Sequence, residues 1–344
     1  MKINSHEINL NKPCYLIAEI SHNHQGNAEK AFDIIREAAA NGASAIKFQK
    51  RDNKNLYLPS FFEKPYEHEH SFGKTYGEHR LFLEPKIQWL KKANQLTHEL
   101  GLDFIMTVFD LKSLELCEKK LNVDAYKIQS ADLTSHYLIE KIATTKKPFF
   151  MSCGASSLRE IKKTYKFCRK LNAKFCLMYA VSEYPTYDNN TNIKRIIQLK
   201  KELKTDLIGF SCHNKSVEPA IYSRVLGTVA IEKHFTLNKN QKGPDHKISL
   251  MPKELKNLRK QLNQVDIFMG NYWTKNQQIE DYQLDARYKM GKCAISIKAL
   301  KKGEILSADY IAYKSPMDGK NPVEVAKLIG KKIKFDLKKG EVIK

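Results

Sequence analysis

A short apolar run, a polar turn and a helical pattern follow one another repeatedly from Tyr15 to about Met269. The apolar runs have the length of buried strands, and they are Tyr15–Ile20, Ala45–Phe48, Phe104–Thr107, Ala125–Ile128, Phe149–Ser152, Phe175–Tyr179, Ile208–Ser211 and Ala230–His234. Helical patterns lie between them, including Ala28–Ala40, Lys86–Leu100, Leu158–Lys170, Ile193–Glu202 and a candidate last helix at Pro252–Met269. A Ser157–Glu160 capping box begins the helix at Leu158–Lys170. Eight such units predict a closed (β/α)8 TIM barrel. An open doubly wound sheet is the alternative, but no glycine-rich dinucleotide fingerprint follows the first strand.

Two segments interrupt this rhythm. Lys50 to Pro85 joins the second strand to its helix and is rich in Tyr, Phe, His and charge, which favours an ordered lid over a disordered loop. After about Gly270 the pattern changes to short β-like pieces, among them Lys292–Ile297 and Ile333–Leu337, and two Lys-Lys-Gly-Glu turns. We therefore expect a barrel over 1–270, a linker over 271–287 and a small β-rich domain over 288–344. So small a domain is near the lower limit for an independent core.

Composition excludes several classes of protein. The chain is 42% hydrophobic and 28% charged, and it lacks both an apolar run long enough to span a bilayer and the apolar core of a secretory signal. The seven cysteines are scattered without a C-x-x-C pair, which fits a reducing compartment, so we expect a cytoplasmic protein. The net charge of +21 raises nucleic-acid binding as an alternative. Because the basic residues are spread along the chain, we expect solvated helix faces, with some benefit for anionic substrates, and neither a nucleic-acid nor a membrane partner.

Polar side chains stand where the strands of the predicted barrel end, which is where catalytic groups of such barrels lie. Lys47 and Lys127 fall inside strongly apolar strand patterns, and a closed barrel has no edge at which a lysine could reach water. With Ser130, Ser152 and Ser211 they favour a site for a phosphate or carboxylate. Gln49, Thr107 and Asp132 are further polar residues at or just beyond strand ends.

Two histidines end neighbouring strands of the pattern. His213 and His234 are one βα unit apart, so both imidazoles can reach one point. Beside Glu19 they favour an octahedral divalent ion such as Mn²⁺ that keeps open positions, rather than a closed zinc site. Glu19 has two interpretations, a base next to the metal or an ion pair with Lys47. His22 and His24 are either further ligands or exposed loop histidines, and Tyr184 and Asp245 lie in turns that matter only if they cover the mouth of the barrel.

The chain resembles the sialic acid synthase family, whose members use phosphoenolpyruvate to make N-acetylneuraminate and related nine-carbon sugars. The matching stretches are Ile17–Gly26, Ile46–Gln49, Tyr126–Ser130, Tyr184-Pro185, Gly209–His213 and Ile231–Thr236. The segment Ser71–Arg80 looks like the animal-type branch, and 289–344 resembles the family's C-terminal antifreeze-like (SAF) domain. The resemblance covers nearly the whole chain in the right order.

The resemblance implies a reaction and a set of residue roles. His213 and His234 would hold a divalent ion, for which Mn²⁺ is the first candidate and Mg²⁺ and Co²⁺ are the alternatives. The ion polarises the aldehyde of an open-chain amino sugar. C3 of phosphoenolpyruvate then attacks the aldehyde carbon, water adds at C2, and phosphate leaves. Lys47, Lys127, Ser130, Ser152 and Ser211 match positions that hold phosphoenolpyruvate, and Glu19 matches the carboxylate that handles water and protons. Gln49, Thr107, Asp132, Tyr184 and Asp245 match positions around the sugar. The family's domain-swapped homodimer places each SAF domain over the partner's barrel.

The chain departs from the common bacterial pattern at several positions. Cys212 replaces an aspartate, Ser152-Cys-Gly replaces Ser-Thr-Gly, and Asp132 replaces a glutamate. Ser315 stands where many members have an arginine that contacts the N-acetyl group, a residue that the animal-type branch also lacks. That branch accepts a 6-phosphorylated sugar, which would suit the positive charge here. Free N-acetylmannosamine, its 6-phosphate and a diacetamido sugar leading to a legionaminic- or pseudaminic-type acid stay open, as do another aldose condensation and a non-catalytic carbohydrate-binding relative.

Overall fold

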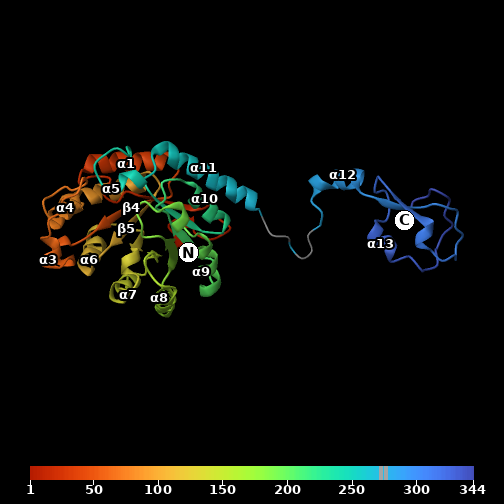
Figure 1. The fold of residues 1–344 in the computed structure, drawn as a ribbon, viewed down its shortest axis with the longest axis horizontal. Coiled ribbons are helices and arrows are strands. Elements are labelled where there is room, and N and C mark those ends of the chain that lie inside the picture. The colour runs from red at the N-terminus through yellow and green to blue at the C-terminus, as the bar shows by residue number, and fades with distance from the viewer. Residues whose placement is uncertain (271–273, 275–277) are drawn as a thin grey trace. The chain divides into compact units, whose positions relative to one another are not determined.

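The computed structural model describes residues 1–270, 274 and 278–344, and it divides after Gly270 into two units (Figure 1). Part of the expected linker, 271–273 and 275–277, lies outside the described residues. Its last residues, 281–287, belong to helix α12 (Asp281–Met290), which the sequence pattern did not predict. None of the helices in the described part combines the length and the hydropathy needed to cross a membrane.

The first unit is a closed barrel of eight parallel strands, as predicted. The strands are β3 (Tyr15–Glu19), β4 (Ala45–Lys50), β5 (Asp103–Val108), β6 (Ala125–Ile128), β7 (Phe149–Ser152), β8 (Phe175–Ala180), β9 (Ile208–Ser211) and β10 (Ala230–His234). Strand β10 closes the barrel on β3, with His234 paired to Glu19 in the parallel register. Because paired residues in a parallel ladder point to the same side, both side chains face the interior.

Helices surround the barrel and bury their apolar faces against it (Figure 1). They are α1 (Ala28–Ala40), α5 (Ile87–Glu99), α6 (Leu111–Lys120), α7 (His136–Thr144), α8 (Leu158–Lys170), α9 (Lys194–Leu203), α10 (Glu218–Val225) and α11 (Pro252–Met269), with 3₁₀ turns η1 (Ser130–Asp132), η2 (Asp188–Asn190) and η3 (His246–Ile248). The predicted capping box at Ser157 is formed with Glu160. Pro252 at the first position of α11 fits, since that position needs no amide hydrogen.

The alternation of side chains along each strand divides the barrel into an interior and an exterior. The lower interior is apolar, with Ile17, Ile105 and Phe150 among its residues. A hairpin of β1 (Lys2–Ile3) and β2 (His6–Glu7) adds Ile3 to this cluster. The same inward series continues toward the carboxyl ends of the strands as polar residues, so the fold places the predicted site residues above an apolar floor.

The lid segment, residues 50–85, is ordered and contains three short helices, α2 (Asn53–Leu56), α3 (Pro59–Phe62) and α4 (Tyr76–Leu83). A Thr75–Glu78 capping box begins α4. Glu84 holds the start of the segment, since its carboxylate accepts from Lys50 Nζ at 2.6 Å, from the amide of Arg51 at 2.9 Å and from Asn53 Nδ2 at 2.9 Å. Tyr57, Phe61, Tyr66 and Tyr76 pack ring against ring within it, as their ring centroids lie 4.6–6.0 Å apart.

The second unit has a small core of its own, made of Ala294, Leu300, Leu306, Val325 and Ile343. Its elements are α12, β11 (Cys293–Ser296), η4 (Ala308–Tyr310), β12 (Ile311–Lys314), antiparallel to β11, and α13 (Pro322–Ala326). Both Lys-Lys-Gly-Glu segments are turns with a glycine at positive φ, 94° at Gly303 and 81° at Gly340. The β-like piece Ile333–Leu337 forms no strand; Leu337 makes an isolated bridge to Leu300.

Candidate active site

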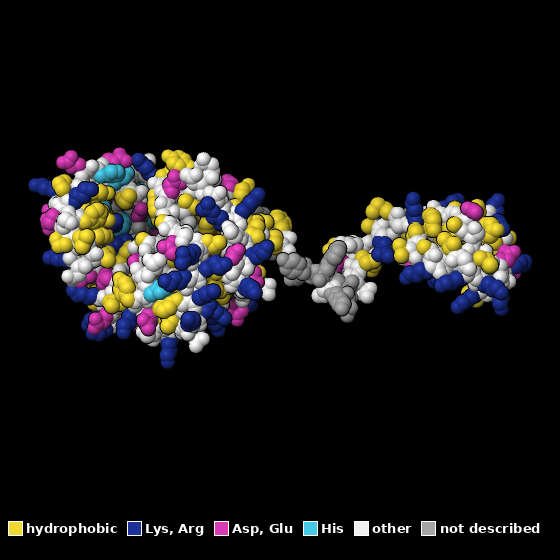
Figure 2. All heavy atoms as spheres, turned by 60° about the horizontal axis from the view of Figure 1, so that its bottom comes forward, with side chains coloured by type: hydrophobic (Ala, Val, Ile, Leu, Met, Phe, Trp, Pro, Cys, Tyr) yellow, Lys and Arg dark blue, Asp and Glu magenta, His cyan; other side chains and the backbone are white. Residues whose placement is uncertain are grey.

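A cavity of about 600 Å³ lies at the carboxyl ends of the barrel strands, under the lid segment. It is lined by twelve of the thirteen residues predicted from the sequence: Glu19, Lys47, Gln49, Thr107, Lys127, Ser130, Ser152, Tyr184, Ser211, His213, His234 and Asp245. Figure 2 shows a group of histidine side chains in the upper part of the barrel unit and histidine also apart from it, whereas lysines and arginines are scattered over the whole face.

Asp132 is the one predicted residue that the structure does not bring into this lining. It lies in η1, one turn beyond Ser130, and accepts hydrogen bonds from Gln129 Nε2 at 2.9 Å and Ser135 Oγ at 3.0 Å. The 3₁₀ turn explains its position, because a residue beyond a strand end no longer follows the inward alternation of the strand.

Two lysines and two glutamates form a buried cluster at the base of the cavity. Lys127 Nζ lies 2.6 Å from Glu232 Oε2, Lys47 Nζ lies 2.6 Å from Glu19 Oε2, and Lys47 also lies 3.7 Å from Glu232. Of the two interpretations of Glu19, the contact with Lys47 is thus present, while its place beside His234 in the register keeps it next to the histidine pair. The four charges balance, so an apolar barrel can bury them.

Burial and charge act in opposite directions on these groups. Burial alone would raise the pKa of Glu232, but the charges of Lys127 and Lys47 outweigh it and hold the pKa well below its ordinary value. Burial lowers the pKa of Lys127 more than Glu232 raises it, while at Lys47 the negative charges of Glu19 and Glu232 outweigh burial and raise the pKa.

Glu232 was absent from the predicted site, although it stands two residues before His234 and therefore faces the same side of β10.

Hydroxyl groups complete the base of the cavity. Lys47 Nζ donates to Thr107 Oγ1 at 2.9 Å, and Ser211 Oγ donates to Glu232 Oε1 at 3.0 Å. Ser152 Oγ is buried without a hydrogen-bond partner, so it is free to bind a ligand. Ser130 Oγ accepts from the amide of Gly154 at 3.1 Å, and a Cβ at that glycine would come within 2.9 Å of the same oxygen. The glycine therefore allows these two strand ends to approach.

His213 and His234 lie together on the same wall, with ring centroids 5.6 Å apart. His213 Nδ1 donates to Val181 O at 2.8 Å, which leaves Nε2 with a free lone pair, and burial lowers the pKa of His213 to about 3, so the ring is neutral. Nδ1 of His234 is buried without a partner. An imidazole nitrogen with a free lone pair is what a divalent ion requires. Among the described residues no group of three or more His, Cys, Asp or Glu side chains could hold a metal, so the protein would supply two ligands and leave positions for water and substrate.

Tyr184 and Asp245 lie at the rim, as required of residues that cover the mouth of the barrel. The ring of Tyr184 lies 4.2 Å from that of His213. Asp245 Oδ2 accepts from Ser21 Oγ at 2.6 Å and lies 3.5 Å from His22 Nδ1. Burial raises the pKa of Asp245, but the contacts with His22, His234 and Ser21 lower it further than that, so it is ionised.

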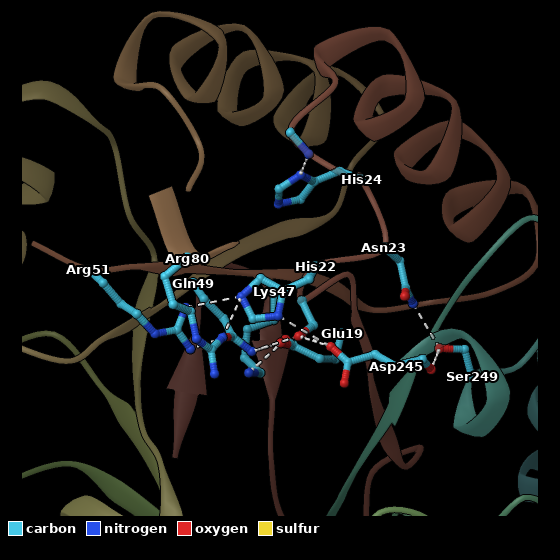
Figure 3. Close-up of polar contacts among 12 residues, drawn as sticks. Glu19, His22, Asn23, His24, Lys47, Gln49, Arg51, Arg80, Asp245 and Ser249 are labelled. Atoms are coloured by element: carbon cyan, nitrogen blue, oxygen red, sulfur yellow. Dashed lines mark hydrogen bonds and ion pairs between the residues drawn. The ribbon is translucent and has the colours of Figure 1, made fainter. Parts of the chain in front are cut away.

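The two loop histidines have different places. His24 is buried away from the cavity, where its Nδ1 accepts from the amide of Gly26 at 2.9 Å and its ring lies 5.2 Å from Trp89 (Figure 3). His22 lines the cavity and lies between Asp245 and two arginines of the lid segment, Arg51 and Arg80. Neither arginine was among the predicted site residues, because both lie in a long connection without periodicity.

Comparisons with known proteins identify the family of the chain. The model of the NeuB family matches residues 34–274. The chain belongs to the NeuB family. It is 31% identical over 332 residues to human N-acetylneuraminate-9-phosphate synthase, covering 96% of this chain and 91% of that protein. It is 32% identical over 340 residues to N,N'-diacetyllegionaminic acid synthase of Campylobacter jejuni, covering 97% and 99%.

A solved structure of N-acetylneuraminic acid synthetase from Leptospira borgpetersenii, in complex with citrate, matches with a TM-score of 0.72 and 27% identity over 83% of this chain and 95% of that one. The resemblance read from the motifs is thereby confirmed, and as a NeuB family member the chain is an enzyme.

Proposed function

We propose that the enzyme condenses phosphoenolpyruvate with an open-chain N-acetylated amino sugar, with the help of a divalent ion, to give a nonulosonic acid and inorganic phosphate. The observation that carries the proposal is the shared cavity, in which a lysine-based anion site and two histidines with free ring nitrogens occupy strand ends of the same barrel. The relatives named above, which are synthases of N-acetylneuraminate 9-phosphate and of diacetyllegionaminic acid, support the same reaction class.

Phosphoenolpyruvate would bind at the base of the cavity. Lys47 and Lys127 would donate to its phosphate and carboxylate oxygens, and the hydroxyl of Ser152 would donate where it now has no partner. Glu19 holds Lys47 from the neighbouring strand, and Glu232 holds Lys127 from across the barrel. Both lysines therefore meet the ligand already oriented, which lowers the entropy cost of binding.

His213 and His234 would hold the divalent ion, which supplies a Lewis acid for the aldehyde oxygen of the sugar. Mn²⁺ is our first candidate, and Mg²⁺ and Co²⁺ are the alternatives. The carbonyl of Val181 accepts from Nδ1 of His213 and so fixes the ring and its tautomer. Nε2 of His213 is then the nitrogen left to bind the ion.

The reaction then forms one carbon–carbon bond, consumes one water molecule and moves one proton from that water. C3 of phosphoenolpyruvate attacks the aldehyde carbon, whose oxygen takes up a proton and becomes a hydroxyl. Water adds at C2, loses a proton, and the C2–O bond to phosphate breaks, which leaves a 2-oxo acid. Glu19 would orient the water and take its proton; its contacts with Lys47 and Gln49 and its place beside His234 support this role. Gln49, Thr107, Tyr184 and Asp245 would surround the sugar, and we keep Asp132 as a more remote candidate.

We also propose, from the family resemblance alone, that the enzyme works as a domain-swapped homodimer with a C-terminal SAF domain. Light scattering on the purified full chain tests the subunit number, for which we expect a mass of about twice 39.7 kDa.

The decisive experiment measures phosphate release from phosphoenolpyruvate by protein stripped with a chelator, with and without added Mn²⁺. N-acetylmannosamine, its 6-phosphate and a diacetamido hexose are tested separately. We expect release that needs both the metal and one of these sugars, and none from the His234→Ala variant. Metal-independent release, or none with any sugar, would contradict the proposal.

A further inference from the structure

Two guanidinium groups of the lid segment meet in the cavity without a carboxylate partner (Figure 3). Arg51 is 7% exposed, follows β4 directly and lies with its guanidinium 3.6 Å from the centre of the Phe109 ring. Arg80 comes from α4 and donates through Nε to Tyr76 Oη at 2.8 Å. Both approach the same nitrogen, His22 Nε2, Arg51 at 3.4 Å and Arg80 at 3.3 Å.

The surroundings supply only neutral acceptors to these charges. Arg51 Nη2 donates to the side-chain oxygen of Gln49, and Arg51 Nε is buried with no partner. In the part of the chain that the structure describes, no carboxylate oxygen lies within 4.0 Å of either guanidinium. Glu84, which is close in sequence to Arg80, binds Lys50, Asn53 and the backbone amide of Arg51 instead.

Two like charges held together out of water are unfavourable unless an anion joins them. Burial and the charge of Arg80 lower the pKa of Arg51 to about 10, whereas Tyr57, Tyr76 and Asp245 outweigh burial at Arg80 and raise its pKa. Two carboxylates act on these charges from beyond contact distance, Glu84 on Arg51 and Asp245 on Arg80. Both are already engaged, since Glu84 binds Lys50 and Asp245 binds Ser21 and His22. The base of the cavity offers no excess of negative charge, because Lys47 and Lys127 balance Glu19 and Glu232.

We infer that Arg51 and Arg80 form a subsite for a phosphate monoester carried by the sugar substrate, at the end remote from its aldehyde. This rests on the proposed function for the orientation of the sugar. A phosphate dianion matches the two positive charges, and guanidinium groups bind its oxygens in pairs. Arg51 Nε, which has no partner in the structure, would then have one.

The position of Gln49 separates this subsite from the site for phosphoenolpyruvate. Its Nε2 donates to Glu19 Oε1 at 2.6 Å and its oxygen accepts from Arg51, so Gln49 lies between the lysine–glutamate cluster and the arginine pair. A sugar bound along Gln49 would have its aldehyde near the histidines and its phosphate at the lid. Neither N-acetylmannosamine nor a diacetamido hexose carries an anion that could fill that place.

Binding tests the subsite without relying on catalysis. Isothermal titration calorimetry compares N-acetylmannosamine 6-phosphate with N-acetylmannosamine on the full-length protein without phosphoenolpyruvate. We expect the phosphate ester to bind at least about 10-fold more tightly, and the Arg80→Gln variant to lose most of that preference. Arg36→Gln is the matched control, because it removes the same charge from an exposed pair with Asp33 on α1. Since Arg51 is buried, Arg51→Lys, which keeps the charge but loses the forked donors, replaces a neutral variant there.

The kinetic test distinguishes the two phosphate-bearing substrates. Arg80→Gln should raise KM for the sugar phosphate about 10- to 100-fold and leave KM for phosphoenolpyruvate within about twofold. A rise in KM for phosphoenolpyruvate instead would assign the arginines to that substrate and overturn the inference, as would equal affinity of the wild-type protein for the two sugars. If no sugar gives phosphate release, the proposed function fails, and the calorimetry still decides whether a phosphate ester binds at Arg80.

Discussion

The charge balance at the base of the barrel makes a quantitative prediction for Glu232→Gln. The side chain keeps its shape, but the buried cluster is left with Lys47 and Lys127 against Glu19 alone. Removing one partner from a buried, hydrogen-bonded ion pair costs about 3–5 kcal/mol. The lower end applies here, because the new amide oxygen can still accept from Lys127, whose ammonium lies 2.6 Å from the present carboxylate. We therefore expect a loss of about 3 kcal/mol, which for a unit of this size lowers the melting temperature by about 6–12 °C.

Circular dichroism at 222 nm, which follows the helices of the barrel, measures the melting temperature near pH 7.5. Glu202→Gln is the matched control, since Glu202 forms an equally short pair with Lys162, 2.6 Å, on the exposed surface, and we expect no change there. The double variant Glu232→Gln/Lys127→Met restores the balance between Lys47 and Glu19. It should therefore be more stable than the sum of the two single losses by at least about 1 kcal/mol. Strictly additive losses, or equal losses in Glu232→Gln and Glu202→Gln, would refute the argument from charge balance.

Three further predictions concern the site and its surroundings. His213→Ala and His234→Ala should each abolish metal-dependent phosphate release while the far-ultraviolet circular dichroism spectrum stays unchanged; an active variant would contradict the metal assignment. Lys127→Met should raise KM for phosphoenolpyruvate about 10- to 100-fold, because a charge-assisted donor is lost, and steady-state kinetics showing an unchanged KM would contradict that role. Burial lowers the pKa of His24 from 6.5 to about 3, so the unfolded chain binds one more proton than the folded chain between those pH values. The free energy of unfolding therefore falls by about 1.4 kcal/mol for each pH unit as the pH drops through this window. His24→Asn, whose side-chain oxygen can still accept from Gly26, should reduce this slope by that amount in urea titrations at pH 6.0 and pH 5.0, and an unchanged slope would show that His24 does not titrate as its burial implies.

Much of the barrel follows from local pattern, because strand and helix periodicities are properties of neighbouring residues. The bounds of Ala125–Ile128 and Pro252–Met269 agree with the sequence prediction at both ends. The short helices of the lid segment and helix α12 were not predicted. Helix α12 has no buried residue and hardly any difference between its faces, so it leaves no apolar stripe for the pattern to reveal.

The site could be located from the sequence because strand ends of a barrel converge, but its electrostatics could not. Glu232 compensates Lys127 across 105 residues of sequence, and no local signal connects the two. An inward carboxylate was nevertheless required once two inward lysines were accepted, so charge balance was the available signal. Arg51 and Arg80 are brought together by the fold of the lid segment, whose path a sequence without periodicity does not reveal.

Barrel strands hold the residues at the base of the cavity, whereas the lid segment holds the arginines at its other end. Lys47, Lys127 and Glu232 stand on strands whose register is fixed on both sides, so a change there disturbs the barrel itself. Arg80 stands on α4, in a lid segment held by ring packing and by Glu84. Groups on strands are positioned more precisely than groups on connections, whereas connections tolerate replacement. The chemistry common to the family would therefore reside on the strands, and the recognition of one particular sugar would reside on the lid.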